Sequence, residues 1–362
     1  MRIPPVEFLI WAKRHRRVRY EMTLSGAPPV DLADFDAGPE HVEIRIRGVD
    51  GDPRIIDAVA RRYGVDPRGV VPVPGASGGN FVVMATADRT RPILIEEPVY
   101  GPMRRAAAFF NARLIPLLRR PEHNFRIDPQ ELRAGLQAGA GVVYLSNLHN
   151  PSGQPIDARQ MREIAGAADE FGALVVVDEV YLDYAHVNFG APRWTAASLA
   201  DNVVVVNSLT KVYGAGALRL GWLISTPARA RHFRRMMDYL NVEHPAPATS
   251  LGLRAFERID RLEARTRELY VRARPIVADW LASCPELHAY PNHGAIFECV
   301  RLPEGVKAGD LSKLLYREYQ TRVVPGEFFN LPDHLRVSTT LPPDDLRTGL
   351  ANVAEGVRRL QP

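Results

Sequence analysis

The sequence predicts an α/β fold in which a large, mostly parallel sheet is flanked by helices, with a smaller α+β domain at the C-terminal end. Seven short runs of β-branched and other apolar residues recur over the first two thirds of the chain. They are almost continuously apolar, which is typical of strands buried on both faces of a sheet. Helical segments separate the runs, and this alternation favours parallel pairing. The runs cover residues 70–73, 93–95, 114–117, 142–145, 174–177, 203–206 and 220–224.

Two of the intervening helices begin and end at recognisable residues. Asp52 followed by Pro53 is a typical N-cap and first-turn pair, which predicts a helix over residues 54–63. Asp157 likewise predicts a helix over residues 158–171 that stops at Gly172.

The pattern changes after about residue 247. Residues 248–283 are typical of one long helix, in which Pro275 predicts a kink. Shorter strands follow at residues 295–300, 322–325 and 335–338, and helices at 310–320 and 343–360. We therefore expect an arm over residues 1–30 that packs with the small domain, a large domain over 31–247 and a small domain over 248–362.

Composition narrows the class of protein. Of the 362 residues, 46% are apolar and 24% are charged, which provides a full core and argues against a disordered chain. No apolar run reaches the roughly 18–20 residues of a membrane span. The first residues lack the basic stretch and cleavage site of a signal peptide, so we expect a cytoplasmic protein. Cys284 and Cys299 form no CxxC pair and indicate neither a zinc site nor a disulfide framework.

Positive charge comes almost entirely from arginine. One basic run at residues 13–19 has the composition to contact nucleic acid or anionic lipid, but a solvated helix face explains it more simply. We therefore predict neither a nucleic-acid nor a membrane partner. The chain holds 42 arginines and only four lysines: Lys13, Lys211, Lys307 and Lys313. Chemistry that requires an amine therefore has four candidates.

A glycine-rich stretch, Gly75-Ala76-Ser77-Gly78-Gly79, joins a predicted strand to a predicted helix. Its backbone N–H groups and the Ser77 hydroxyl suit a phosphate at a helix N-terminus. The same residues match G-x-S-x-G, the nucleophile elbow of α/β-hydrolases, and a plain strand–helix turn also explains them.

Polar residues follow two further strands. Asn150, in Asn-Pro-Ser-Gly, comes after the strand at 142–145, where an Asn-Pro turn is the simpler reading. Asp178 and Tyr181 come directly after the strand at 174–177. Because carboxyl ends of parallel strands are where ligands bind, Asp178 is either a structural cap or the partner of a cation.

The strand at 203–206 is followed by Ser208, Lys211 and, eight residues later, Arg219. A lysine beside a buried strand and small residues is desolvated, which favours a nucleophilic amine. An arginine at this distance suits a phosphate. The other three lysines have simple solvated roles.

These groups together match the requirements of one cofactor, pyridoxal 5′-phosphate (PLP). Its aldehyde needs an amine, its pyridine nitrogen an acid, its phenolate oxygen hydrogen-bond donors, and its phosphate a serine and an arginine. The hydrolase interpretation uses only the glycine-rich stretch and leaves Lys211 and Asp178 without a role.

In this order, the motifs resemble the class I/II aminotransferases of PLP fold type I over essentially the whole chain. The resemblance implies that Lys211 forms the Schiff base and that Asp178 pairs with the pyridine nitrogen. It implies that Tyr181 and Asn150 donate to the phenolate oxygen, and that Tyr100, in Glu-Pro-Val-Tyr, stacks on the ring.

The resemblance also implies residues for the phosphate and the substrate. Arg336, in Leu-Arg-Val-Ser, corresponds to the arginine that binds the substrate α-carboxylate, which a planar fork suits. Ser25, Gly26 and Asn150 are expected near the amino-acid and keto-acid substrates. The phosphate site would consist of Ala76, Ser77, Ser208 and Arg219.

The resemblance implies a homodimer with the active site at the subunit interface. Many relatives carry a tyrosine about five residues before the glycine equivalent to Gly51, and it reaches the partner's phosphate. This chain has Ile44-Arg45-Ile46-Arg47 there instead.

Alternative functions stay open at this stage. The pattern Ile3-Pro4-Pro5, Trp11 and Leu24-Ser25-Gly26 is similar to a sub-group that includes capreomycidine synthase, which favours a PLP-dependent lyase or cyclase. An α/β-hydrolase using Ser77 is the alternative from another enzyme class. A PLP-binding regulator would need a DNA-binding segment, for which the residues before the core leave little room.

Overall fold

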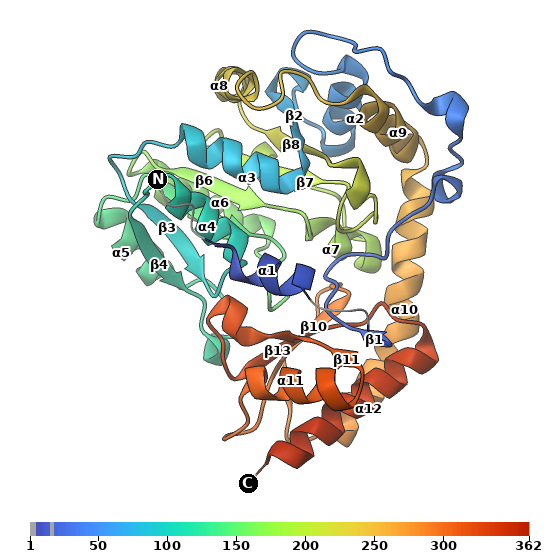
Figure 1. The fold of residues 1–362 in the computed structure, drawn as a ribbon. Helices are drawn as coiled ribbons and strands as arrows, with labels where there is room; N and C mark the ends of the chain where they lie inside the picture. Colours follow the sequence, from blue (N-terminus) through green and yellow to red (C-terminus); the bar gives the residue numbers. More distant parts are fainter. Residues whose placement is uncertain (1–4, 15–17, 362) are drawn as a thin grey trace.

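The computed structural model describes residues 5–14 and 18–361. Its main sheet has seven strands in the order β2-β8-β7-β6-β5-β3-β4 (Figure 1). All seven predicted strands are confirmed, and pairing is parallel except that β8 runs antiparallel to both β2 and β7. The strands are β2 (Val70–Pro74), β3 (Ile93–Glu97), β4 (Leu114–Leu118), β5 (Val142–Ser146), β6 (Leu174–Asp178), β7 (Val203–Ser208) and β8 (Leu220–Ile224).

Helices cover both faces of this sheet. Alternate residues of one strand enter different apolar clusters: Val175 and Val177 of β6 face one side, and Val176 the other. The cluster with Val176 includes residues of α3 (Gly75–Thr86), α4 (Gly101–Phe109) and α8 (Pro227–Met237). The opposite cluster includes α2 (Pro53–Tyr63), α5 (Pro129–Gln137), α6 (Ala158–Asp169) and α7 (Leu182–Phe189). This two-sided burial is the reason for the nearly continuous apolar runs.

The predicted helix starts are confirmed, and one strand differs from expectation. The Asp52 carboxylate accepts a hydrogen bond from the backbone of Arg54, and the Asp157 carboxylate accepts one from Gln160. Strand β4 is only partly buried, so its predicted burial on both faces is wrong. The reason is its position at the sheet edge, where it pairs with β3 alone.

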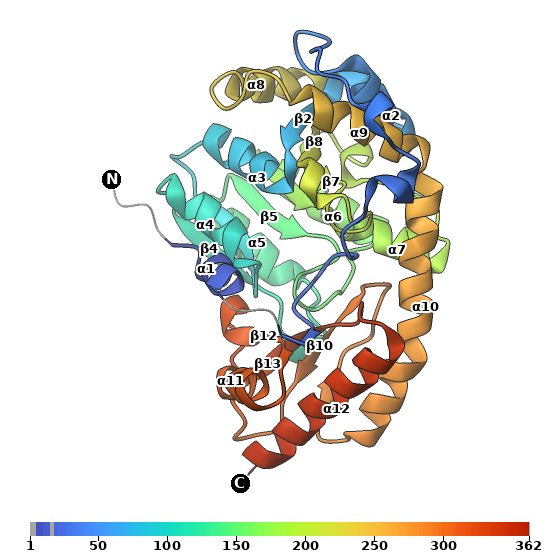
Figure 2. The same ribbon diagram turned by 45° about the vertical axis from the view of Figure 1, so that its right-hand side comes forward.

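A second sheet of four strands, in the order β12-β13-β10-β9, lies at the other end of the molecule (Figure 2). It has an apolar cluster of its own, shared with α10 (Ile259–Ser283), α11 (Ala308–Glu318) and α12 (Pro343–Leu360). Its strands are β9 (His288–Ala289), β10 (Phe297–Arg301), β12 (Val324–Pro325) and β13 (His334–Ser338). The predicted α+β character of this region is confirmed.

The helix predicted over residues 248–283 is two helices. Helix α9 (Ala246–Glu257) ends at Arg258, and α10 begins at the next residue and continues through Pro275. Arg258 leaves helical geometry at φ −113°, and its Nε donates to Asp36 Oδ2 at 2.9 Å. Helix α9 packs in the cluster of the large sheet, whereas most buried residues of α10 belong to the second cluster.

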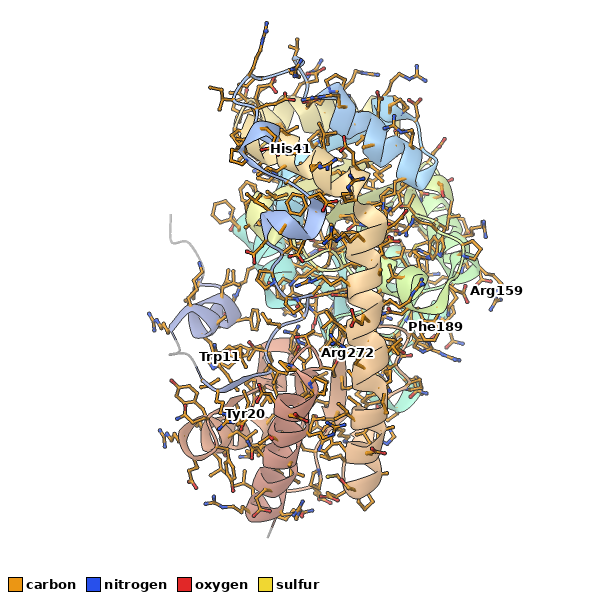
Figure 3. The ribbon with its side chains drawn as sticks, turned by 90° about the vertical axis from the view of Figure 1, so that its right-hand side faces the viewer. Trp11, Tyr20, His41, Arg159, Phe189 and Arg272 are labelled. Atoms are coloured by element: carbon orange, nitrogen blue, oxygen red, sulfur yellow. The ribbon has the colours of Figure 1, made fainter. Side chains whose placement is uncertain are left out.

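The N-terminal residues cross from the large sheet to the small one. Helix α1 (Glu7–Arg14) contacts α4, and β1 (Tyr20–Glu21) pairs in parallel with β11 (Thr321–Arg322). Figure 3 shows Trp11 and Tyr20 on this path, and the Arg322 guanidinium lies 4.3 Å from the Trp11 ring centroid. Within the basic run at 13–19, residues 15–17 lie outside the described residues. No helix in the described part of the chain has the length and apolarity to cross a membrane.

Candidate active site

A cavity of about 220 Å³ opens at the carboxyl ends of β5, β6 and β7, beside the N-terminus of α3. This is the edge of a parallel sheet at which ligands bind. The structure brings together here every residue that the sequence assigned to the cofactor. Those lining the cavity are Ala76, Ser77, Tyr100, Asn150, Asp178, Tyr181, Ser208, Lys211 and Arg219.

The Lys211 amine lies at the cavity wall and is held by Ser25. Its Nζ donates to Ser25 Oγ at 3.0 Å, and the Tyr181 hydroxyl donates to the same oxygen at 2.8 Å. The Lys211 carbonyl oxygen accepts from Ala27 N at 2.7 Å. A Cβ at Gly26 would lie 3.1 Å from that oxygen, so a residue without a side chain permits this close approach. Ser25 and Gly26 therefore position the amine.

Asp178, at the end of β6, is 5% exposed. Its Oδ2 accepts from Asn80 Nδ2 at 2.7 Å, and its Oδ1 accepts from Val180 N at 3.2 Å. Burial raises the pKa of this carboxyl, and its hydrogen bonds and the charge of Lys211 offset part of the rise. No ion pair reaches Asp178 within residues 5–14 and 18–361. The site therefore offers a buried carboxylate to a cationic ligand atom.

The opposite end of the cavity suits a phosphate. Ala76 and Ser77 lie in the first turn of α3, where backbone N–H groups are unpaired and the helix dipole favours an anion. Arg219 adopts a left-handed backbone at φ 51° and donates to Pro74 O at 3.3 Å. A Cβ at Gly75 would lie 2.5 Å from Arg219 Nη2, so glycine is required for the arginine to reach this turn. The glycine-rich stretch is thus a helix N-terminus with a cation beside it.

Arg336, on β13 of the small sheet, does not line the cavity itself but contacts Asn150, which does. Its guanidinium is 2% exposed and donates to Asn150 Oδ1 at 2.8 Å and to Thr23 O at 3.1 Å. Burial lowers the pKa of this guanidinium. It forms no ion pair with any residue that the structure describes. A buried cation without an anion, next to Asn150, is suited to a ligand carboxylate.

Comparison with known proteins identifies the family. The model of the class I and II aminotransferases matches residues 43–353. The chain belongs to this family. It is 28% identical over 313 residues to the arginine–pyruvate transaminase AruH of Pseudomonas aeruginosa, covering 83% of this chain and 78% of that protein. It is 27% identical over 313 residues to the capreomycidine synthase of Streptomyces vinaceus, covering 84% of this chain and 79% of that protein.

Solved structures share the fold over the whole chain. A PLP-dependent aminotransferase from Streptococcus suis has a TM-score of 0.91 at 20% identity, with 100% of both chains covered. LysN, an α-aminoadipate aminotransferase from Thermus thermophilus complexed with N-(5′-phosphopyridoxyl)-L-leucine, has a TM-score of 0.86 at 20% identity, with 99% and 96% covered. The fold is therefore PLP fold type I, and this aminotransferase is a transferase with PLP as its cofactor.

The residues of the cavity fit PLP. A buried amide nitrogen, Asn150 Nδ2, has no hydrogen-bond partner in the part of the chain that the structure describes and is available to the phenolate oxygen. Asp178 has no ion-pair partner among residues 5–14 and 18–361 and is available to the protonated pyridine nitrogen. Lys211 offers the amine, and Arg219 with the first turn of α3 offers the phosphate site.

Two aromatic rings close one side of the site. Tyr100 lines the cavity, and burial raises the pKa of its hydroxyl. Phe8 of α1 packs edge-on against Tyr100 at 5.7 Å between ring centroids, and against Phe328 at the same distance. Helix α1 therefore joins the wall of the cofactor site to the short 3-10 helix Gly326–Phe329, which lies between β12 and β13.

Sequence reasoning missed several residues of the wall. Asn80, which holds Asp178, lies inside α3 and matches no motif quoted for the site. Its position one helical turn after Ala76 is the only indication that it faces the same cavity. Ser146, Thr210 and Met103 also line the cavity.

The hydrolase alternative has no support in the geometry. Ser77 lies in the first turn of α3, and no hydrogen bond joins it to a histidine within the described residues. A serine nucleophile requires such a base. Family membership favours transamination over both this alternative and the cyclase.

Proposed function

We propose that this aminotransferase transfers an amino group between an L-amino acid and an α-keto acid, with Lys211 as the reacting amine. When bound, PLP supplies an aldehyde that condenses with amines and a ring that withdraws electrons from the substrate α-carbon. Lys211 Nζ, positioned by Ser25, would be the amine that holds PLP, and the same amine would move the proton at the substrate α-carbon. The proximity of Nζ to the cavity is the observation that supports this role.

The remaining residues orient and polarise the groups around that proton. Asp178 keeps the pyridine nitrogen protonated, and Asn80 fixes the orientation of its carboxylate. Asn150 would donate to the phenolate oxygen, as would Tyr181 once its hydroxyl turns away from Ser25 Oγ, and Tyr100 would restrain the ring from one face. The phosphate is held by Ala76, Ser77, Ser208 and Arg219.

Arg336 binds the α-carboxylate of the amino acid. Asn150 already accepts from its Nη1, so the guanidinium is oriented before substrate arrives. The rings of Phe8, Phe297 and Phe329 lie 5.9, 5.6 and 5.2 Å from the guanidinium and exclude water around it. Exclusion of water strengthens the charge pair that the carboxylate forms.

The enzyme acts as a homodimer. Residues 44–50, where relatives carry the tyrosine that reaches the partner, are exposed along their whole length. Ile44 is 87% and Val49 90% exposed, and Tyr239 and Val242 add exposed apolar surface nearby in the large domain. Large apolar side chains exposed to this extent favour a role in an interface. Sedimentation at equilibrium should give the dimer mass, and Ile44→Asp with Val49→Asp should reduce it to one chain.

We further propose a cytoplasmic location and the division into an arm (1–30), a large domain (31–247) and a small domain (248–362). Cys284 and Cys299 are both buried and unpaired, as is usual in reducing compartments. The pairing of β1 with β11 supports an arm that packs with the small domain.

Borohydride reduction followed by peptide mass spectrometry tests the role of Lys211. Reduction should fix PLP covalently to Lys211 and to none of the other three lysines. Lys211→Ala should lose both the label and the visible absorbance of bound PLP, whereas Lys307→Ala, an exposed matched control, should keep both. A label on another lysine would contradict the proposal.

Product analysis separates the reaction types. Incubation of the enzyme with an amino acid and an α-keto acid should aminate the keto acid. Ammonia release or a cyclised product, without amination of the keto acid, would instead favour the lyase or cyclase.

A further inference from the structure

Asn80 is a buried polar side chain in the interior of α3, where the apolar residues 81–84 follow it. It is 6% exposed and lines the PLP cavity. Asparagine is a poor helix former, and a buried amide is costly unless it is hydrogen-bonded, so its presence at this position requires a reason. Ala76, one helical turn earlier, lies in the turn that suits the phosphate. Helix α3 therefore contributes side chains to two parts of the cofactor site.

The side chain of Asn80 makes a single hydrogen bond within residues 5–14 and 18–361, and its partner is Asp178. Asn80 Nδ2 donates to Asp178 Oδ2 at 2.7 Å, whereas Asn80 Oδ1 is buried without a partner among these residues. The reverse orientation of the amide would bring Oδ1 against Oδ2, and two acceptors repel each other unless the carboxyl carries a proton. The amide therefore stabilises the ionised carboxylate, and hydrogen bonds to an ionised group are the stronger kind.

Few groups offset the burial of Asp178. Burial raises the pKa of its carboxyl, and among the contacts that lower it the hydrogen bond from Asn80 has the largest effect, ahead of the Val180 N–H and the charge of Lys211. The Val180 N–H belongs to the backbone and is present whatever the side chains are. Three further titratable groups are coupled with the charge of Asp178, and none of them donates to its carboxylate within the described residues: Tyr100, Tyr144 and Glu179.

We propose that Asn80 is a positioning residue that keeps Asp178 ionised and thereby sets the protonation of the ring nitrogen of bound PLP. This inference rests on the proposed function, in which Asp178 faces that nitrogen. An ionised carboxylate accepts from a protonated ring nitrogen, whereas a carboxylic acid would donate its own proton and leave the nitrogen neutral. A protonated nitrogen withdraws electrons from the substrate α-carbon more strongly, so Asn80 affects the reaction through Asp178.

Nitrogen NMR of the enzyme loaded with PLP that carries an isotopic label at the ring nitrogen tests the proposal. The unmodified enzyme should give the signal of a protonated pyridine. In Asn80→Leu, which removes the donor and keeps a similar volume, the signal should move toward that of the unprotonated ring. Asn80→Ala, which cannot overfill the site, should give the same change, and circular dichroism checks that both variants are folded.

Asn202→Leu is the matched control, because it also removes a buried amide. Asn202 is 7% exposed and lies outside the lining of the PLP cavity. Its Nδ2 donates to Ala165 O at 2.9 Å and to Ala173 O at 3.2 Å. This variant should lose stability and leave the nitrogen signal unchanged.

Cofactor affinity gives a second measurement. The apo protein is titrated with PLP and with the analogue that has a carbon atom in place of the ring nitrogen. Asn80→Leu should weaken PLP by about tenfold or more, because Asp178 then has to lose its proton before it pairs with the nitrogen. It should leave the affinity for the analogue unchanged, since the analogue has no nitrogen for Asp178 to pair with.

An unchanged nitrogen signal in both Asn80 variants would overturn the proposal. Equal losses of affinity for PLP and for the analogue would overturn it too, because Asn80 would then only shape the cavity. Asp178→Asn separates this failure from that of the proposed function. If Asp178→Asn loses the protonated signal and Asn80→Leu keeps it, the role of Asp178 stands and that of Asn80 fails. If Asp178→Asn and the unmodified enzyme give the same signal, the role of Asp178 itself fails.

Discussion

Glu96 and Asp178 are two buried carboxylates near the carboxyl ends of strands in the same sheet, and they are satisfied in opposite ways. Both are nearly inaccessible to solvent, and burial raises the pKa of both. Glu96 has an arginine, Arg119, at 2.8 Å. Asp178 has only the Asn80 amide and the Val180 N–H, with no ion pair among the residues described.

The difference separates a structural carboxylate from a functional one. A charge taken out of water is costly unless a partner stays beside it. The partner of Glu96 is built into the chain, so this pair is complete without a ligand. The partner of Asp178 has to come from outside the described chain, and in the proposed function it is the pyridine nitrogen of PLP. Burial alone would not distinguish them.

The largest expected effect is that of Asp178→Asn. The amide cannot keep the pyridine nitrogen protonated, so the rate of amino transfer should fall by about 10²–10³-fold. The apo protein should lose at most about 1–3 kcal/mol of unfolding free energy, because one of the two hydrogen bonds accepted by Asp178 is lost while a buried charge without an ion pair is removed. Single-turnover kinetics and thermal unfolding of the apo protein measure the two effects. A variant that unfolds at lower temperature and retains its rate would place Asp178 with Glu96, as a structural group.

Glu96→Gln should lower the stability of the protein far more than its rate of amino transfer. It leaves the Arg119 guanidinium buried without its anion, which costs about 3–5 kcal/mol of unfolding free energy. Amino transfer per folded molecule should change much less than in Asp178→Asn. Denaturant titration measures the loss. The double variant Glu96→Leu with Arg119→Met removes both charges and should recover part of the loss, because Ser146 N and Phe125 O remain without their partners. No recovery at all would show that the unpaired Arg119 charge is not the cause.

The sequence predicted a role for Asp178, and the ion pair between Glu96 and Arg119 was missed. Asp178 was predicted because it follows an apolar strand and precedes Tyr181, a local pattern. Glu96 also ends an apolar strand, but its partner Arg119 lies one strand away, and only the folded sheet brings them together. Asn80 was missed for the same reason, since its contact with Asp178 spans 98 positions.

The fold shows the same limit: local sequence patterns do not reveal contacts between residues that are far apart in the chain. Strands were predicted from apolar runs because burial on both faces leaves a pattern within each run. The break between the two helices at Arg258 leaves no such local pattern, because neither glycine nor proline occurs there and the flanking residues favour helix. Its contact with Asp36, far away in the sequence, accompanies the break. Local patterns thus predicted the elements, and long-range contacts determined where they end.

The smallest expected effect concerns Glu179, the residue after Asp178, and it is a change in how the free energy of unfolding depends on pH. Burial raises the pKa of its carboxyl to about 8, and its hydrogen bonds with Thr195 and Ala196, at 2.7 Å each, offset part of the rise. A folded-state pKa above the unfolded value means that the folded protein binds the proton more tightly. The contribution of Glu179 to stability is therefore complete at low pH and is lost as the pH rises toward about 8.

Glu179→Gln should flatten this dependence, because the amide mimics the protonated acid and does not titrate. Between about pH 6 and about pH 8, the wild-type free energy of unfolding should fall by up to about 1.4 kcal/mol per pH unit more than that of the variant. Urea titrations across this range measure the difference in slope. Burial raises the pKa of Asp178 as well, so Asp178→Asn should flatten the apo curve at pH values above the ordinary aspartate pKa. Glu96→Gln should instead lower the whole curve, since removal of the anion leaves the Arg119 charge unpaired at every pH in the range. Parallel curves for Glu179→Gln and wild type would mean that Glu179 is ionised in the folded protein, and burial without a cation would then not be enough to hold a carboxyl neutral in this sheet.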